Sequence, residues 1–231
     1  MNKKVLLSAL MILAAVSAMS QTRLGIRGGL NLANVTIDKS GNTDESKMLP
    51  SFNAGLFADV PLAVGFALEP GLMLTGKGSK VHTSSSVLNT DMETRLNPLY
   101  LEVPLNFVGK VPLGNDTHLL LGAGPYAAFG IGGKVRTVGT FLGQDVDDKS
   151  DIKWDDDTPF NEDDKNQGWD KLKRFDYGAN FLAGFQFGNA MVTANYGLGL
   201  AKINSGGDND ADQKNKNRVF SISLGFLLGG R

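Results

Sequence analysis

The segment from Arg174 to Ala201 constrains the fold most, because its apolar residues change parity at one dipeptide. Before Gly188-Asn189 they occupy odd positions, and after it they occupy even positions. A two-residue turn requires this switch, and Gly-Asn is a recognised tight-turn pair. The cross-strand pairs that we predict, all on one apolar face, are Phe187 with Ala190, Phe185 with Val192 and Phe181 with Tyr196.

Both arms of this hairpin are longer than most strands. Each arm runs at least twelve residues, whereas the mean strand in soluble proteins has about 5–6 residues. A tilted strand that crosses a bilayer needs about 9–11 residues. The face opposite the apolar one carries glycines, amides, a threonine and one acid, Asp176. The hairpin is therefore long enough to cross a membrane with one face toward lipid.

The N-terminus has the three parts of a secretory signal peptide. Residues 3–4 are basic, residues 5–16 are apolar, and residues 18–20 place small side chains at a cleavage site. The alternative, a transmembrane helix, needs about 20 apolar residues, and this run is too short. We assign residues 1–20 to a signal peptide and residues 21–231 to one exported barrel domain.

The composition excludes several classes of protein. The chain has no cysteine, which excludes a disulfide scaffold, a thiolate metal site and a lipid anchor on an N-terminal cysteine. A net charge of −1 gives no global field that would attract nucleic acid. The 29 glycines and the scarcity of helical periodicity favour an all-β protein.

The alternation of the opening hairpin recurs along the chain and predicts eight strands. Outside the two hairpin arms, the predicted strands span residues 23–33, 51–60, 65–77, 98–108, 118–131 and 219–228. The predicted connections alternate between three short turns and four long polar loops. The turns lie around 61–63, 110–117 and 188–189, and the loops span 36–50, 78–97, 132–173 and 202–218.

This alternation of connection lengths is typical of an outer-membrane barrel with short periplasmic turns and long extracellular loops. We therefore predict an eight-stranded antiparallel transmembrane up-and-down β-barrel, with both termini on the periplasmic side. The alternatives are a soluble β-sandwich and a lipocalin-like barrel whose apolar residues face inward. Apolar-face aromatics also gather at the strand ends, as two interfacial belts require. These are Phe52, Phe129, Phe175, Tyr177 and Phe220 at the loop end, and Phe66, Phe107, Phe185, Phe187 and Phe226 at the turn end.

Six stretches carry a family resemblance: LGIRGGLNLANV, FNAGLFADVPL, EPGLMLTGKGSK, NPLYLEVPLNFVGKV, LLGAGPYAAFGIGGK and FDYGANFLAGFQF with NYGLGL. In these stretches, which span nearly the whole mature chain, the sequence resembles the PorT-like family of outer-membrane β-barrel proteins of Gram-negative bacteria. The resemblance implies the barrel fold and the outer membrane, and it implies no activity. The family's namesake supports protein secretion, but no motif here carries that role over. One departure is the end of the chain, where Gly-Gly-Arg231 follows Leu228 in place of a terminal aromatic signal.

Charged residues fall on the predicted inner face. They are Arg23, Arg27, Asp59, Glu69, Lys77, Glu102 and Asp176. An eight-stranded barrel has an interior that side chains fill, and buried charges must be paired. We expect Arg27, Glu69 and Glu102 to form a paired network that plugs the lumen, with Tyr100 and Tyr126. The alternative is a path for protons or ions.

The third loop is acidic and aromatic. Clustered carboxylates attract Ca²⁺, and the fourth loop has Asp208, Asp210 and Asp212 at alternating spacing. An EF-hand is excluded, because Gln213 and Val219 stand where its glycine and glutamate belong. We favour a solvated acidic loop. The loop aromatics, which either cap the barrel or stack on a sugar or protein, are Trp154, Phe160 and Trp169.

The chain has two histidines, which are the candidates for an enzyme of the outer membrane. His82 lies near Ser84, Ser85 and Ser86, and His118 lies at the turn end of its strand. Neither has a nucleophile and an orienting acid that can be recognised from the sequence.

We interpret the chain as a non-enzymatic outer-membrane barrel with a structural or partner-binding role through its extracellular loops. The alternatives are a porin-like barrel for small solutes and a lipid-modifying enzyme. The partners that we expect are outer-membrane lipids (lipopolysaccharide and phospholipid) and an extracellular protein or glycan that contacts residues 132–173. We expect no nucleic acid, cofactor, metal or catalytic site, and a monomeric protein.

Overall fold

The computed structural model describes residues 22–36, 46–85, 90–155, 171–201 and 216–228. These residues form thirteen strands. The strands are β1 (Arg23–Thr36), β2 (Ser46–Lys47), β3 (Leu49–Ala63), β4 (Phe66–Gly76), β5 (Ser79–Ser85), β6 (Thr90–Gly114), β7 (Thr117–Phe141), β8 (Gln144–Asp151), β9 (Lys153–Asp155), β10 (Lys171–Lys173), β11 (Phe175–Phe187), β12 (Ala190–Gly199) and β13 (Lys216–Leu228). No helix within these ranges is long and apolar enough to cross a membrane.

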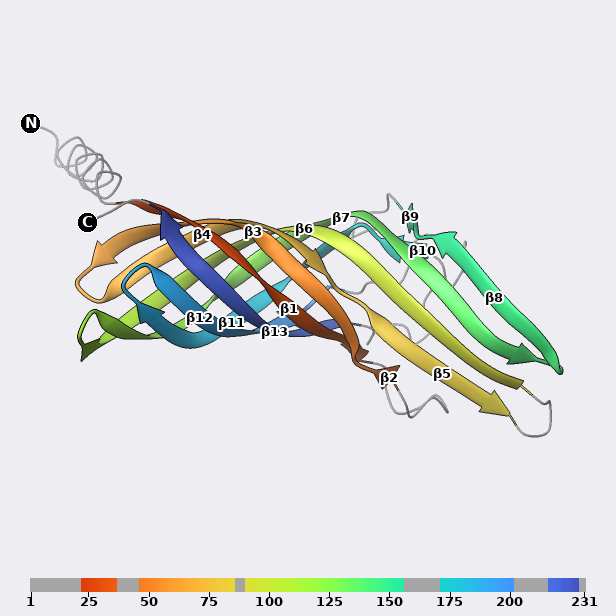
Figure 1. Ribbon diagram of the computed structural model, residues 1–231. Helices are drawn as coiled ribbons and strands as arrows, with labels where there is room; N and C mark the ends of the chain where they lie inside the picture. The colour runs from red at the N-terminus through yellow and green to blue at the C-terminus, as the bar shows by residue number, and fades with distance from the viewer. Residues whose placement is uncertain (1–21, 37–45, 86–89, 156–170, 202–215, 229–231) are drawn as a thin grey trace, which may run out of the picture.

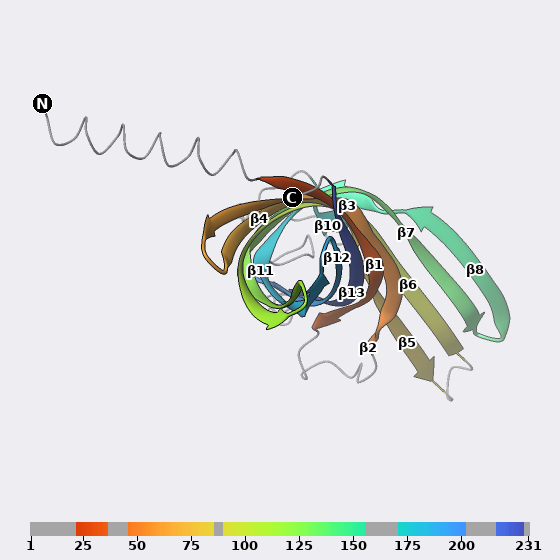
Figure 2. The ribbon, with the colours of Figure 1, turned by 60° about the vertical axis from the view of Figure 1, so that its left-hand side comes forward.

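Eight of the strands close into a barrel (Figures 1 and 2). The order around the ring is β1, β3, β4, β6, β7, β11, β12 and β13, and β13 pairs again with β1. All of these neighbours are antiparallel. The predicted eight-stranded up-and-down barrel is therefore confirmed. We refer below to the turn end, where the three tight turns lie, and the loop end opposite.

The opening hairpin has the register that its parity switch predicts. Phe187 pairs with Ala190, and Phe181 pairs with Tyr196, across the turn at Gly188. The other two turns are tighter than expected. The first lies between Ala63 and Phe66, after residues 61–63, and the second consists of Asn115 and Asp116, both with positive φ. The backbone of β6 keeps pairing down to Gly114, so most of residues 110–117 is strand.

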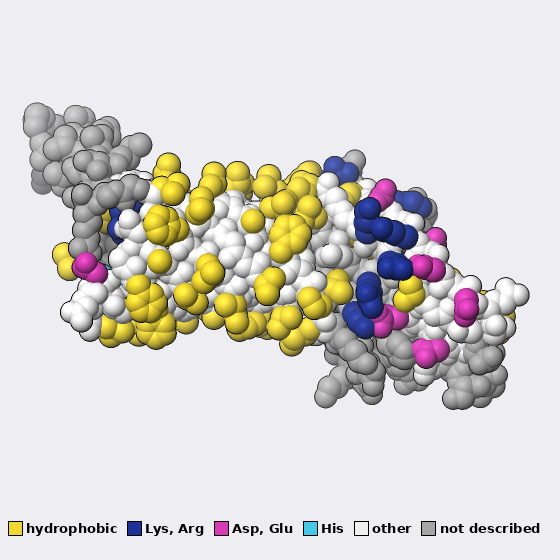
Figure 3. Space-filling view, viewed as in Figure 1, with side chains coloured by type: hydrophobic (Ala, Val, Ile, Leu, Met, Phe, Trp, Pro, Cys, Tyr) yellow, Lys and Arg dark blue, Asp and Glu magenta, His cyan; other side chains and the backbone are white. Residues whose placement is uncertain are grey.

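The outer surface of the barrel is an apolar band (Figure 3). Leu30 is 73% exposed and Leu224 is 67% exposed, although a water-soluble barrel or sandwich would bury such side chains. Exposed members of both predicted aromatic belts, such as Phe52 and Phe66, share this surface. The inward-facing alternatives are therefore wrong, because a continuous band of large apolar side chains points out of the barrel, while the buried charged and amide side chains lie in the lumen.

Two of the predicted loops contain a sheet instead. Residues 78–97, predicted to be a loop, form β5 and the first part of β6. Residues 132–173, also predicted to be a loop, contain the last part of β7, together with β8, β9 and β10. Strands β5, β6, β7 and β8 pair side by side beyond the barrel, and we call this four-stranded sheet the extension (Figure 1). Its strands lack an apolar face, so alternation of hydrophobicity does not reveal them.

The wall continues from the barrel into the extension through a β-bulge. Leu99 pairs with Gly132 and Tyr100 with Gly130, so Ile131 is an extra residue on β7. The bulge changes which residues of β7 face outward, from odd positions in the barrel to even positions in the extension. A bulge also bends its strand, and Figure 2 shows the extension leaving the ring along β6 and β7.

Candidate functional site

The lumen is filled in layers, and the first layer closes the turn end. Asp59 is almost fully buried and accepts hydrogen bonds from Arg23 at 2.8 Å and from Lys110 at 2.6 and 2.7 Å. These residues also line a pocket of about 270 Å³ that includes His118. Two cations on one carboxylate fix the strand ends β1, β3 and β6 to one another.

The second layer is an apolar cluster that the sequence analysis missed. It consists of Phe57, Val108, Leu120, Leu182, Met191 and Leu227, all at most 4% exposed. These residues fall on the face that we described as polar. Their spacing does carry the signal, because each stands at an inward position where a water-filled lumen would place a polar side chain. The cluster makes this part of the interior dry.

The third layer is an ion pair on top of this cluster. The Arg27 guanidinium donates to Glu69 at 2.8 Å, and its carbon lies 4.4 Å from the centre of the Phe57 ring. The predicted pairing of Arg27 with Glu69 is therefore confirmed. The predicted inclusion of Glu102 is wrong, because Glu102 lies farther toward the loop end and binds Lys77 instead.

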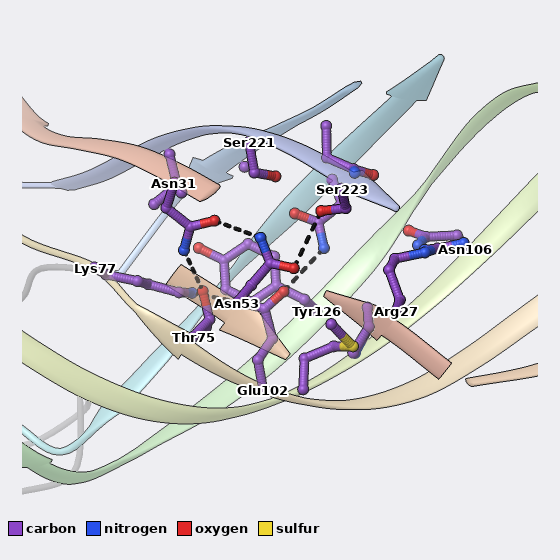
Figure 4. Close-up of a pocket in the computed structure, with 16 residues that line it drawn as sticks. Arg27, Asn31, Asn53, Thr75, Lys77, Glu102, Asn106, Tyr126, Ser221 and Ser223 are labelled. Carbon is purple, nitrogen blue, oxygen red and sulfur yellow. Dashed lines mark hydrogen bonds and ion pairs between the residues drawn. The ribbon is translucent and has the colours of Figure 1, made fainter. Parts of the chain in front are cut away.

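The fourth layer consists of amides and hydroxyls around a small cavity (Figure 4). Asn31 donates to Thr75 at 2.9 Å, Asn53 donates to Asn31 at 2.6 Å, and Ser223 donates to Asn53 at 3.1 Å. The cavity that these side chains line has a volume of about 70 Å³. A polar space of this size suits a few water molecules and excludes nutrient-sized solutes.

The fifth layer is a buried cluster centred on Lys77. Its ammonium lies 2.7 Å from Glu102 and 3.0 Å from Asp176, and 3.9 Å from the centre of the Tyr126 ring. Tyr126 also donates to Asp176, at 3.2 Å, and Tyr100 is completely buried beside the cluster. Because Lys77, just after β4, contacts acids from β6 and β11, it ties these three strands together.

The loop end of the lumen is capped by part of the third predicted loop. Trp154 on β9 packs edge-on against Tyr100, with ring centroids 5.4 Å apart, and its ring occupies the space that a side chain at Gly130 would need. Leu172 on β10 is 1% exposed, and Ile152 donates a backbone hydrogen bond to Gly133. We call β9, β10 and Ile152 the cap. It confirms the predicted capping role of Trp154, whereas Phe160 and Trp169 lie outside the described residues.

The other sequence candidates do not gather into a site. Within the described ranges, no group of three or more histidine or acidic residues is placed to hold a metal ion. Asp208, Asp210, Asp212 and residues 156–170 fall outside those ranges. His118 lines the turn-end pocket, where the described lining residues include no serine, threonine or cysteine. His82 lies on β5, in the extension, and the structure does not describe its side chain.

Comparisons with known proteins agree on the architecture. A family model described as "Outer membrane protein beta-barrel domain" matches residues 16–205. Comparison with curated proteins finds no significant sequence match.

Similar solved structures include two small surface barrels. Ail, the attachment invasion locus protein of Yersinia pestis, is 15% identical, with a TM-score of 0.39, and the match covers 89% of this chain and 98% of Ail. Ail has also been solved in complex with the heparin analogue sucrose octasulfate, with a TM-score of 0.40 to this chain. Neisserial surface protein A is 11% identical, with a TM-score of 0.42, over 88% of this chain and 96% of that chain. Such distant likenesses carry no argument about the role of this chain.

Proposed function

Because the chain belongs to the outer membrane protein beta-barrel domain family, we propose that it is a non-enzymatic protein that binds a partner at its loop end. Its location is the outer membrane, with the apolar band in the lipid. We place the loop end outside the cell and the tight turns in the periplasm, as short turns and long outer connections indicate. The partner is an extracellular protein or glycan, and the surface it contacts lies on residues 132–173.

The observation that carries this proposal is the filled lumen. From Asp59 at one end to Trp154 at the other, the described residues fill the lumen with charged pairs, apolar side chains and the cap, around a cavity of about 70 Å³ in the middle of the barrel. A conduit for small solutes needs a continuous wet path, which this packing does not provide. The extension is the part of the described structure that lies beyond the eight-stranded barrel. We therefore assign partner binding to that sheet.

The tip of the extension has features of a contact surface. Phe141 and Leu142 are 49% and 61% exposed at the turn between β7 and β8. Leu142 has a φ of 51°, a left-handed conformation that is costly for a leucine. Backbone strain of this kind is concentrated at functional positions, and exposed apolar side chains on an otherwise polar tip favour a partner protein.

Two other functions have weaker support. An enzyme needs a nucleophile beside a base, and the turn-end pocket offers only His118 with Arg23, Asp59 and Lys110. Membership of the PorT-like family rests on the six stretches quoted above, which lie in β1, β3, β4, β6, β7, β11 and β12. We include that membership in the proposal without a role in secretion, because those stretches encode strands and turns.

Conductance tests the filled lumen. The mature chain in planar bilayers should show no steps at the nanosiemens scale, because the cap and the Lys77 cluster block the path. A Trp154→Ala variant removes one wall of the cap and leaves the lower layers in place, so it should remain closed as well. A stable open channel in the unmodified chain would replace the binding proposal with the solute-carrier function.

Photo-crosslinking on living cells tests the binding surface. A photoreactive phenylalanine at Thr140 or Gln144 places the probe on the tip of the extension, and one at Asn115 places it on a turn at the opposite end. We expect a discrete adduct with a surface protein or glycan from the tip positions and none of the same mass from Asn115. Identical adducts from both ends, or none from the tip, would contradict the proposal.

A further inference from the structure

Four cationic side chains form one row across the extension. Lys80 on β5 pairs with Arg95 on β6, Arg95 pairs with Arg136 on β7, and Arg136 pairs with Lys149 on β8. Directly opposed residues in antiparallel strands place their side chains on the same face. We call Lys80, Arg95, Arg136 and Lys149 the basic row. Like charges in this arrangement repel one another. An anionic partner would therefore stabilise the row.

The basic row lies on the face that continues the lipid-facing band. On β6, Arg95 stands an even number of positions from the outward residues Leu99 and Leu101, and all three share one face. On β7, the bulge at Ile131 brings Arg136 onto the same side. Figure 3 shows dark blue side chains gathered directly where the yellow band ends. The row therefore faces the membrane side of the wall.

The height of the row matches the lipid headgroups. Arg95 is four residues from Leu99, the last outward apolar residue of β6, which is about 13 Å along a strand. With a strand tilt of about 45°, the backbone of Arg95 lies roughly 9 Å beyond the edge of the apolar band, measured along the membrane normal. The headgroup layer is about 5–8 Å thick on each side of the bilayer. Long basic side chains reach back toward such a layer.

Acidic side chains on the same face compensate the row only in part. Glu93 forms ion pairs with Lys80 and Arg95, and Asp147 forms one with Arg136, at 2.9 Å. Both carboxylates lie two residues farther along their strands, away from the barrel. Four cations against two carboxylates leave the row net positive, with its positive charge on the side nearest the membrane.

Apart from Lys47 on β2, which lies opposite Lys80 at the end of the row, the remaining charges on this face do not change the balance at the row. Lys134 and Asp151 lie directly opposite each other on the barrel side of the row, so together they add no net charge. Asp91 and Asp145 both lie opposite Thr140, at the tip. The tip is four residues from Arg136, or about 13 Å along the strand, which is more than the distance of about 8 Å over which salt screens exposed charges.

We propose that the basic row binds the phosphate groups of phosphorylated glycolipids in the outer leaflet. Arginine and lysine both bind phosphate, and the arginine fork does so through two hydrogen bonds. With strands about 4.8 Å apart, the row spans roughly 14 Å, so one headgroup with two phosphates can contact several of its members. The lipid would hold the extension upright on the membrane surface. This inference goes beyond the proposed function: it rests on the loop end lying outside the cell and is otherwise independent of the partner that binds there.

The test compares two double variants of the full mature chain in zwitterionic micelles, titrated with bis-phosphorylated lipid A and followed by native mass spectrometry. Arg95→Gln/Lys149→Gln removes half of the row and keeps the Lys80–Glu93 and Arg136–Asp147 pairs. The matched control, Lys153→Gln/Lys173→Gln, removes the same charge from the cap strands β9 and β10. Hydrogen exchange of β5 to β8 checks that each variant keeps the extension folded.

Each cation near an anionic surface strengthens binding by roughly a factor of five, so the row variant should bind lipid A about 25-fold more weakly than the unmodified chain. The control should change binding less than threefold, and dephosphorylated lipid A should bind weakly to every form. Equal loss in both variants, or equal binding of the dephosphorylated lipid, would overturn the proposal. So would displacement of lipid A by soluble heparin at equimolar concentration, because the row would then be a site for a soluble glycan.

Discussion

Strands β6 and β7 pass through both regions of the molecule, the barrel and the extension, and each is 25 residues long. In the barrel, their outward residues are apolar, as at Leu101 opposite Phe129. In the extension, the same ladder pairs Arg95 with Arg136. The opposite face there is mixed, with Leu96 opposite Val135 and with Thr94 and Thr137 hydrogen-bonded at 3.2 Å. Backbone pairing thus resumes beyond the bulge at Ile131, while the surroundings of the outward face change from lipid to water.

The two regions differ in how their ion pairs are exposed to solvent. In the barrel, ion pairs such as Lys77 with Asp176 are buried on all sides. In the extension, both members of the pair between Arg136 and Asp147 are more than half exposed. Buried pairs are costly to break because the remaining charge has no water, whereas exposed pairs contribute little. Substitutions in the two regions should therefore differ in their effect on stability.

The largest effect should follow removal of the buried lysine. Lys77→Met leaves Glu102 and Asp176 without their cation, and breaking such a buried cluster costs about 3–5 kcal/mol. The matched change Arg136→Met in the extension should leave the free energy of unfolding unchanged within error. Urea unfolding in phospholipid vesicles, followed by the heat-modifiable gel shift, measures both.

A double variant separates the charge effect from the packing effect. Lys77→Met/Asp176→Asn removes one of the stranded carboxylates, so it should recover part of the stability that the single variant loses. Equal costs for Lys77→Met and Arg136→Met would show that the two regions do not differ in the way their burial indicates.

A smaller effect separates the two outward faces. Leu72 is 48% exposed on the lipid-facing band of β4, and Arg at this position should cost about 2–4 kcal/mol, since a charge in the bilayer core is poorly solvated. Val138 faces outward in the extension, opposite Glu93. Val138→Arg should change stability by less than about 0.5 kcal/mol. The same unfolding assay measures both, and a costly Val138→Arg would place the extension inside the membrane.

The barrel was predictable because lipid imposes a pattern on its sequence. Outward positions must be apolar, whereas most inward positions are small or polar, so the register from Phe187 and Ala190 to Phe181 and Tyr196 follows from the order of the residues alone. The ion pair of Arg27 with Glu69 followed from the same parity. The extension could not be predicted in this way, because water on its outward face removes the need for alternation. Only the β-branched residues of 133–140, such as Val135 and Thr137, favour a strand there.

The partners inside the lumen were harder to predict than its lining. The alternation of apolar and polar residues placed Lys77, Glu102 and Asp176 on the inner face. It did not give the position of each side chain along the barrel axis, and that position decides which acid each cation contacts. The pairing of β4 with β6 gives this position, because Thr75 lies opposite Tyr100, two residues from Glu102 on the same face. The cap was partly predictable from Trp154, an aromatic within an acidic loop. The site where the Trp154 ring packs depends on Gly130, because a side chain at that position would occupy the space of the indole ring.

The smallest effect is a dependence of the extension on pH, through the ion pairs of Glu93 with Lys80 and Arg95. A hydrogen bond from Lys80, assisted by one from Arg95, holds the pKa of the Glu93 carboxyl below its ordinary value. A depressed folded-state pKa contributes stability that is fully present above the ordinary pKa and is lost as the pH falls through the depressed value.

Protonation of Glu93 would leave the four cations of the basic row with one carboxylate fewer. The protection factors of amides in β5 and the first part of β6, which correct for the slower intrinsic exchange in acid, should therefore fall as the pH falls. In a Glu93→Gln variant, whose amide cannot titrate, these protection factors should be lower at neutral pH and should change less on acidification. An extension whose exchange responds to acid equally in both forms would show that another group carries the effect.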